Sequence, residues 1–148
     1  MLYFSKGSPD EIIGAEELNR ALKSFTAAMG DRKKILILPP DITRAHSGAG
    51  TITEKLWEMF GERVKDIMPA LGTHVPMEQN EISAMYGKVP HSLFREHHWR
   101  TDVTEMGRIP GEYVSEVTDG RLGFDYPVQV NKLLASGGEL TFTKATVG

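Results

Sequence analysis

One apolar run, Ile35-Leu36-Ile37-Leu38, lies between Lys33-Lys34 and Pro39-Pro40 and sets the class of fold to expect. Four consecutive apolar residues without polar alternation are typical of a strand that is covered on both faces, as in a parallel sheet. A second strand is expected over residues 64–71, despite the charged and proline residues inside it. A helical pattern separates the two runs, so the order strand, helix, strand predicts a βαβ arrangement with parallel strands.

Three helices with one apolar face are expected around these strands. Ser8-Pro9-Asp10-Glu11 has the pattern of a helix start, with a serine cap and proline at the first helical position. Thr51 or Thr53 can cap the second helix, and Pro76 lies near the first turn of the third. The residues expected to face inward are Leu18, Leu22, Phe25 and Met29 in the first helix, Leu56, Trp57 and Phe60 in the second, and Ile82, Met85 and Tyr86 in the third.

The remaining third of the chain has a weaker pattern. Residues 103–107 are expected to form a third strand, and residues 128–134 a helix. The alternation near 113–126, with Asp119-Gly120 as a turn, predicts a β-ribbon. There is no internal repeat and no low-complexity linker, so residues 1–148 are expected to form a single α/β domain with a Rossmann-like parallel sheet and flanking helices.

Composition narrows the classes of function. An apolar fraction of 40% and a charged fraction of 25% are those of an ordinary globular protein. The net charge of -3 offers no basic face for nucleic acid, and no apolar run approaches the roughly 20 residues that span a membrane. Cysteine is absent, which excludes disulfides and thiol nucleophiles. The first residues lack the pattern of a signal peptide, so a cytoplasmic location is the default expectation.

Two polar loops follow the two predicted strands, Asp41-Ile42-Thr43-Arg44 after the first and Gly72-Thr73-His74-Val75-Pro76 after the second. In open α/β sheets, ligands bind beyond the carboxyl ends of the strands. Arg44 offers a planar set of donors for a carboxylate or phosphate, whereas His74 can exchange a proton near neutral pH. Asp41 and Thr43 can hold the loop or bind a ligand hydroxyl. These residues predict a site for an anionic small molecule that undergoes proton transfer.

Plainer interpretations of the same residues stay open. Asp41 and Arg44 can form an Asx turn and a surface ion pair, and His74 can simply cap or pack. The histidines at 91, 97 and 98 could be considered as a metal cluster. A solvated loop is favoured there, because adjacent histidines diverge on any regular element and no H-E-x-x-H motif is present. We therefore assign no metal ligand.

Two ordered motifs resemble the N-terminal domain of the nickel-dependent lactate racemase family. They are Leu38-Pro39-Pro40-Asp41-Ile42-Thr43-Arg44, similar to a D-x-T-R loop after a buried strand, and Gly72-Thr73-His74-Val75-Pro76-Met77, similar to a G-T-H-x-P element. Val130-Asn131-Lys132-Leu133-Leu134 also resembles a V-N-x-x-L segment of the family, so the similarity covers approximately Lys34 to Leu134.

The resemblance implies a racemase or epimerase of 2-hydroxy acids that uses a nickel-pincer nucleotide. In that chemistry a hydride leaves C2 of the substrate while a histidine removes the hydroxyl proton. His74 would be a catalytic acid/base. Asp41, Thr43 and Arg44 would contact the cofactor, and Arg44 would also bind the substrate carboxylate.

Several family features are missing from this chain. The family has a second histidine in an x-P-H segment, a lysine in a G-F-S-G-G-x-K-like run that tethers the cofactor, and a later nickel-binding histidine. No histidine follows His98, and Lys144 does not lie in the context of the tether. We therefore expect an N-terminal part that needs the missing C-terminal portion as its partner, and that neither retains the cofactor nor turns over substrate alone. The alternative is a non-catalytic module that binds an anion or nucleotide, or one subunit of a split site.

Overall fold

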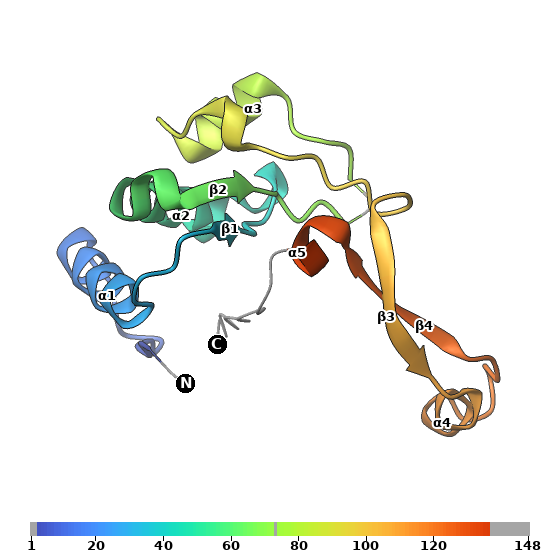
Figure 1. Ribbon diagram of the computed structural model, residues 1–148. Helices are drawn as coiled ribbons and strands as arrows, with labels where there is room; N and C mark the ends of the chain where they lie inside the picture. The colour runs from blue at the N-terminus through green and yellow to red at the C-terminus, as the bar shows by residue number, and fades with distance from the viewer. Residues whose placement is uncertain (1–2, 73, 137–148) are drawn as a thin grey trace. The chain divides into compact units, whose positions relative to one another are not determined.

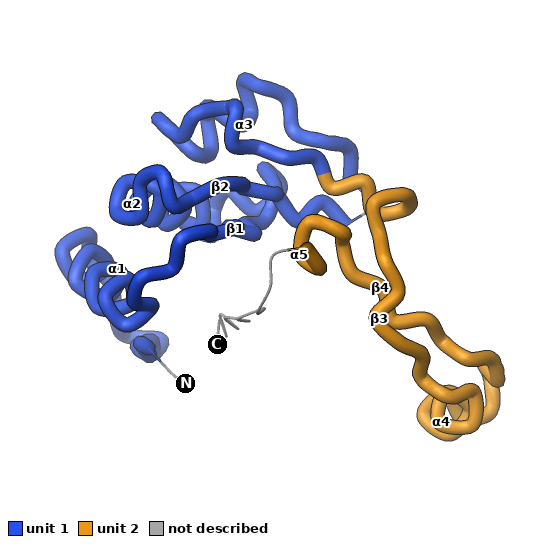
Figure 2. Tube along the Cα trace, viewed as in Figure 1, with its two compact units in different colours: residues 1–96, 142–148 blue, residues 97–141 orange. Residues whose placement is uncertain are grey.

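The computed structural model describes residues 3–72 and 74–136, which have a mixed α/β fold (Figure 1). In chain order the elements are α1 (Ala15–Ala28), β1 (Ile35–Ile37), the 3-10 helix η1 (Ile42–Ser47), α2 (Ala49–Phe60), the 3-10 helix η2 (Gly61–Arg63), β2 (Val64–Ile67), α3 (Gln79–Tyr86), the 3-10 helix η3 (His91–Leu93), β3 (Val103–Ile109), α4 (Gly111–Val117), β4 (Tyr126–Asn131) and α5 (Lys132–Ser136). The described residues group into two compact units, unit 1 up to Glu96 and unit 2 from His97 (Figure 2).

The expected parallel pair of strands is present in unit 1. β1 pairs with β2 in parallel, with Ile37 in register with Ile67. Regular pairing of β2 ends at Ile67, earlier than the predicted 64–71, and then continues as a single bridge between Pro40 and Ala70. The Ala70 N–H donates to the Pro39 carbonyl at 2.8 Å. The carboxyl ends of the two strands are thereby held side by side.

The predicted inward faces of the three helices form the core of unit 1. α2 contacts both α1 and α3, and lies behind the β1–β2 pair in the view of Figure 1. The three helices end shortly before glycines with positive φ, which are Gly30, Gly61 and Gly87. The buried centre of the core is Phe60, Val64, Ile67, Tyr86 and Val89, against which Phe25, Met29, Leu56, Trp57, Ile82 and Met85 pack.

The predicted helix start at residues 8–11 is wrong. These residues form a turn in which the Glu11 N–H donates to the Ser8 carbonyl at 3.2 Å, and α1 begins at Ala15 after an extended Gly14. Ile12 is 90% exposed. An added helical turn there would therefore bury no apolar stripe, and a helix gains most of its stability in a protein from such burial.

Unit 2 contains an antiparallel pair of strands. The strand predicted at 103–107 is confirmed within β3, and it pairs with β4, so that Val103 lies opposite Asn131. The ribbon predicted near 113–126 is placed wrongly, since residues 113–117 lie in α4 between the two strands. The residues of this segment that are not exposed are Gly111, Val114, Ser115 and Thr118, and their spacing of three and four positions is helical rather than alternating. The helix predicted at 128–134 is also wrong over its first half, which belongs to β4, and only α5 is helical.

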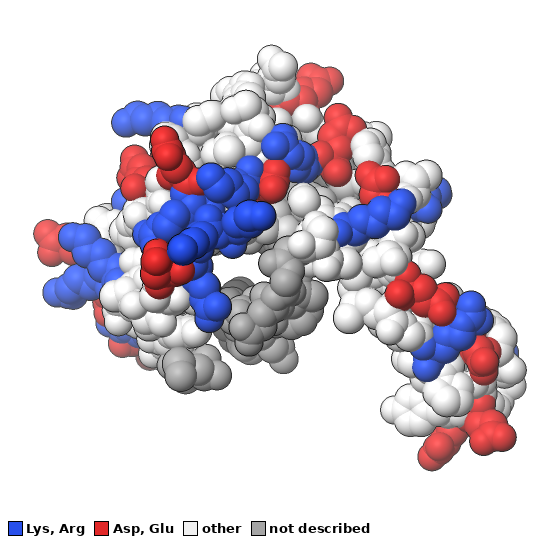
Figure 3. Space-filling view, viewed as in Figure 1, with Lys and Arg blue, Asp and Glu red and all other residues white. Residues whose placement is uncertain are grey.

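The surface shows charges of both signs. On the face seen in Figure 3, lysine and arginine side chains gather over β2 and the turn that leads into β1, with acidic side chains beside them. Among residues 3–72 and 74–136, no helix is long and apolar enough to cross a membrane.

Candidate functional site

The two polar loops meet at the carboxyl ends of β1 and β2. Asp41 directly follows the bridge between Pro40 and Ala70. Beyond Ala70, the His74 N–H closes a turn by donating to the Leu71 carbonyl at 2.9 Å. Gly72 has φ +57, a conformation that glycine adopts without strain. The turn brings His74 to Asp41.

Asp41 and His74 form a direct contact. His74 Nδ1 lies 2.5 Å from Asp41 Oδ2. The other carboxylate oxygen, Oδ1, accepts from the Thr43 hydroxyl at 2.5 Å and from the Thr43 N–H at 3.1 Å. The side chain of Asp41 is only 5% exposed, whereas that of His74 is 55% exposed. A buried carboxylate therefore holds a solvent-accessible imidazole.

The surroundings of Asp41 favour its ionised form. Burial on its own raises the pKa of this carboxyl. Hydrogen bonds from the Thr43 hydroxyl, the His74 ring and the Thr43 N–H, together with the charge of His74, outweigh burial and lower the pKa below its ordinary value of 3.8. Asp41 is thus a carboxylate, able only to accept hydrogen bonds, throughout the neutral pH range.

The state of Asp41 determines the tautomer of His74. Because an ionised carboxylate accepts only, the hydrogen bond requires a proton on His74 Nδ1. In the neutral ring the lone pair then lies on Nε2, which has no hydrogen-bond partner among the described residues. A histidine held in this way can take a proton at Nε2 while the carboxylate stabilises the charge that forms.

Arg44 lies next to this pair without joining it. Its backbone N–H donates to the Asp41 carbonyl at 3.0 Å, and its side chain is exposed. The guanidinium makes no hydrogen bond or ion pair with any residue that the structure describes. The plainer interpretation of this loop was an Asx turn together with an ion pair between Asp41 and Arg44. The Asx turn is present, since the Thr43 N–H donates to the Asp41 side chain, but the ion pair is not formed.

Two residues near the site were not singled out as functional from the sequence. His46 lies on η1, exposed, two residues beyond Arg44. Its place in the loop that follows a buried strand could have indicated a functional role. Tyr86 was expected only as a core residue, but its hydroxyl donates to the Pro40 carbonyl at 2.5 Å. Helical spacing predicts that a tyrosine is buried, and contains no information on the partner of its hydroxyl.

His91 and His97 contact residues away from the Asp41–His74 pair. His91 Nε2 lies 2.9 Å from Ser83 Oγ, and His97 Nδ1 lies 3.1 Å from the Asn131 side-chain nitrogen. Within residues 3–72 and 74–136, no three His, Asp or Glu side chains are grouped so that they could hold a metal ion.

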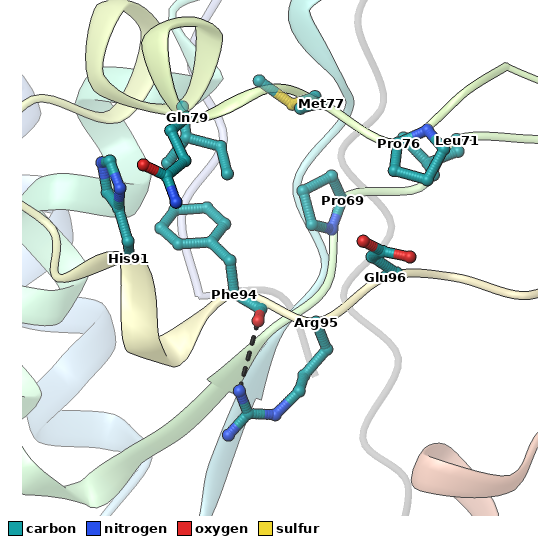
Figure 4. A pocket seen from close by; sticks show the side chains of 10 residues that line it. Pro69, Leu71, Pro76, Met77, Gln79, His91, Phe94, Arg95 and Glu96 are labelled. Carbon is teal, nitrogen blue, oxygen red and sulfur yellow. Dashed lines mark hydrogen bonds between the residues drawn. The ribbon is translucent and has the colours of Figure 1, made fainter.

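A shallow groove lies along the loop that carries His74. It has a volume of about 190 Å³, and Figure 4 shows Pro69, Pro76 and Met77 on one side of it with Phe94 opposite. The Arg95 guanidinium at its edge donates to the Phe94 carbonyl at 3.2 Å. The groove is mostly apolar, in contrast to the polar cluster around Asp41.

Comparisons with known proteins give one structural relative. The chain matches no protein-family model and no curated protein. It is similar to a crystal structure of a Thermotoga maritima protein from the Northeast Structural Genomics Consortium, with 27% sequence identity and a TM-score of 0.70. The match covers 82% of this chain and 30% of that chain, so this chain spans less than a third of the length of its relative.

Proposed function

We propose that this chain forms the N-terminal part of the active site of a 2-hydroxy-acid racemase or epimerase that depends on a nickel-pincer nucleotide. His74 acts there as acid and base on the substrate hydroxyl. The observation that carries the proposal is the 2.5 Å contact between Asp41 and His74 at the carboxyl ends of two parallel strands. The two motifs that resemble lactate racemases come from separate loops, and in the fold they supply the two members of one pair.

The geometry suits the proton half of the reaction. Nε2 of the neutral His74 accepts the proton of the substrate hydroxyl, and Asp41 balances the resulting imidazolium charge. A bound cofactor would supply the acceptor for the C2 hydride, so that a planar 2-keto acid could form. His74 would then return its proton from Nε2 to the substrate oxygen, whichever face of C2 the hydride re-enters.

Anionic groups are the natural ligands of the neighbouring residues. Arg44 is exposed and has no partner among the described residues, so its guanidinium can bind a carboxylate in a bidentate manner. The Thr43 hydroxyl is already engaged by Asp41, which makes Arg44 the stronger candidate for the substrate carboxylate or a cofactor phosphate.

The described residues could supply some, but not all, of the contacts that the cofactor needs. Arg44 can contact an anionic group of it, whereas the described residues contain no group of three metal-ligating side chains. The lysine-containing tether motif is absent from the sequence. When bound, the cofactor supplies a reversible acceptor for the hydride at C2. The remaining contacts to it would have to come from residues other than the described ones.

The test is to follow conversion of one enantiomer of lactate, and of other 2-hydroxy acids, into the other by chiral chromatography. The full polypeptide loaded with nickel-pincer nucleotide is used. We expect His74→Ala to lower kcat by about 100-fold or more, the usual contribution of a general acid or base. His91→Ala is the matched control, since His91 is an exposed histidine that contacts Ser83 rather than a carboxylate. Racemisation that survives in the His74 variant would remove this residue from the mechanism, and a loaded wild type inactive on every acid tested would contradict the proposal.

A non-catalytic anion-binding module is the second candidate, and it is favoured by the guanidinium of Arg44, which has no partner among the residues that the structure describes. Calorimetry of the isolated chain with lactate and with phosphate distinguishes the two. Binding that is lost in Arg44→Ala and kept in Arg20→Ala, an exposed arginine on α1, without any racemisation by the loaded polypeptide, would support the module.

A further inference from the structure

The buried hydroxyl of Tyr86 is a polar group that the proposed chemistry does not use. Tyr86 is fully buried near the end of α3, in the centre of the core of unit 1, with its ring 5.0 Å from that of Phe94. Its hydroxyl leaves the apolar core and donates to the Pro40 carbonyl at 2.5 Å. Pro40 immediately precedes Asp41, so the side chain of α3 reaches the backbone that carries the buried carboxylate.

This contact completes the pairing of three successive carbonyls. The carbonyl of Pro39 accepts from the Ala70 N–H at 2.8 Å, that of Pro40 from Tyr86, and that of Asp41 from the Arg44 N–H at 3.0 Å. The three donors come from the chain after β2, from α3 and from η1. Consecutive carbonyls held from three separate elements leave the backbone little freedom to rotate, and the direction of the Asp41 side chain is set accordingly.

Tyr86 keeps its phenolic proton, and so can donate, in the neutral pH range. Burial raises the pKa of its phenol, and the negative charge of Asp41 raises it further. The other charged or titratable group that contacts Asp41 is His74, which comes from the loop immediately before α3. α3 therefore holds the backbone next to Asp41 through Tyr86, and it directly follows the loop that carries His74.

We infer that Tyr86 is a positioning residue, which sets the place of the Asp41 carboxylate against His74 and Thr43 through the Pro40 carbonyl. The inference concerns the contact itself and holds whether or not the pair catalyses racemisation. It requires that the hydroxyl, and not only the ring, of Tyr86 keeps Asp41 within reach of its donors.

The experiment measures the pKa of Asp41 in the whole chain, from the pH dependence of its carboxyl ¹³C signal. In the wild type we expect a value below 3.8. Tyr86→Phe keeps the ring and removes the hydroxyl, and the pKa of Asp41 should rise toward or above 3.8 as the contacts from Thr43 and His74 loosen. Val89→Ala is the control, because Val89 belongs to the same core but makes no hydrogen bond to the Pro40 carbonyl, and this change should leave the pKa of Asp41 unchanged.

Two results would overturn the inference. One is an Asp41 pKa that is the same in Tyr86→Phe and wild type. The other is an equal rise in Val89→Ala, which would show that Tyr86 acts only through core stability. If Tyr86→Phe does not fold, the wild type still tests the role of Tyr86. A coupling between Tyr86 and Asp41 acts in both directions, so a change at Asp41 must also be felt at Tyr86. The Cζ signal of Tyr86 should then shift across the pH range in which Asp41 titrates, and a signal that stays constant there rejects the role.

Discussion

Asp41 combines nearly complete burial with ionisation, and this combination is produced by its hydrogen bonds. A buried carboxylate without donors would be strongly destabilised and would take up a proton. Here both oxygens are occupied, by Thr43 on one side and His74 on the other. The same contacts that stabilise the charge also fix the tautomer of the histidine. At the scale of single residues, folding and the candidate chemistry therefore depend on one set of contacts.

The lowered pKa of Asp41 predicts a specific dependence of stability on pH. Since the pKa is lower in the folded state than in the unfolded chain, the ionised carboxylate contributes stability that is complete above pH 3.8 and is lost as the pH falls through the folded value. Urea unfolding at neutral pH and below pH 3.8 measures this. Asp41→Asn should be less stable at neutral pH, by about 1–3 kcal/mol, the usual cost of disturbing a buried hydrogen-bonded polar group.

The quantity to compare is the loss of stability on acidification in the wild type and in Asp41→Asn, because the other acidic groups contribute equally to both proteins. The loss of stability on acidification should be smaller in Asp41→Asn than in the wild type. Parallel curves for the two proteins would show that Asp41 has the same pKa in the folded and unfolded states.

At the scale of elements, α2 and α3 approach each other closely at one glycine. A Cβ placed on Gly50 would lie in van der Waals overlap with the Met85 carbonyl oxygen, at 1.9 Å. Met85 precedes Tyr86, so the close approach also determines how near Tyr86 comes to the end of β1. Gly50 lies within the first turn of α2 and is buried against α3.

We therefore expect Gly50→Ala to destabilise the protein by about 1–3 kcal/mol, the usual cost of overpacking. The helices have to separate, because the atom that the new methyl group meets belongs to the backbone. Gly7→Ala is the matched control, since nothing lies within 4 Å of the Cβ it would add. Thermal unfolding of both variants measures the difference, and a Gly50 variant as stable as the control would contradict the close packing.

At the scale of the whole molecule, the apolar core is unevenly distributed between the two units. All five residues at the centre of the core belong to residues 60–89. Among the described residues of unit 2, Val114 is the single buried apolar side chain, and Met106, Tyr113 and Phe124 are each more than half exposed. A segment of this size that buries so little apolar surface is not expected to fold by itself.

This distribution predicts how fragments of the chain behave. Residues 1–96 contain the whole core centre together with Asp41 and His74, so we expect them to fold alone and unfold cooperatively. Residues 97–136 should be largely unfolded in isolation. Circular dichroism with thermal melting tests both fragments. A fragment 1–96 without a cooperative transition would show that unit 1 depends on the rest of the chain.

Much of unit 1 and the membership of the candidate site could be predicted from the sequence alone. Periodicity identified the strand at Ile35–Ile37 and the inward faces of three helices, because these features depend on local spacing. The expected parallel pairing then placed Asp41 and His74 at the same end of the sheet. Their presence in two polar loops after buried strands was sufficient to select them.

Only the tertiary structure decided which polar groups bond to each other. It showed that Asp41 bonds to His74 and not to Arg44, that the Tyr86 hydroxyl reaches the Pro40 carbonyl, and that α4 interrupts the predicted ribbon. The contacts from Asp41 to His74 and from Tyr86 to Pro40 join residues 33 and 46 positions apart, so no local pattern encodes them. In unit 2, few side chains are buried, and the burial pattern from which strands and helices are predicted is correspondingly weak. Sequence thus determines local structure where one face is clearly apolar, whereas long-range packing determines which polar groups meet.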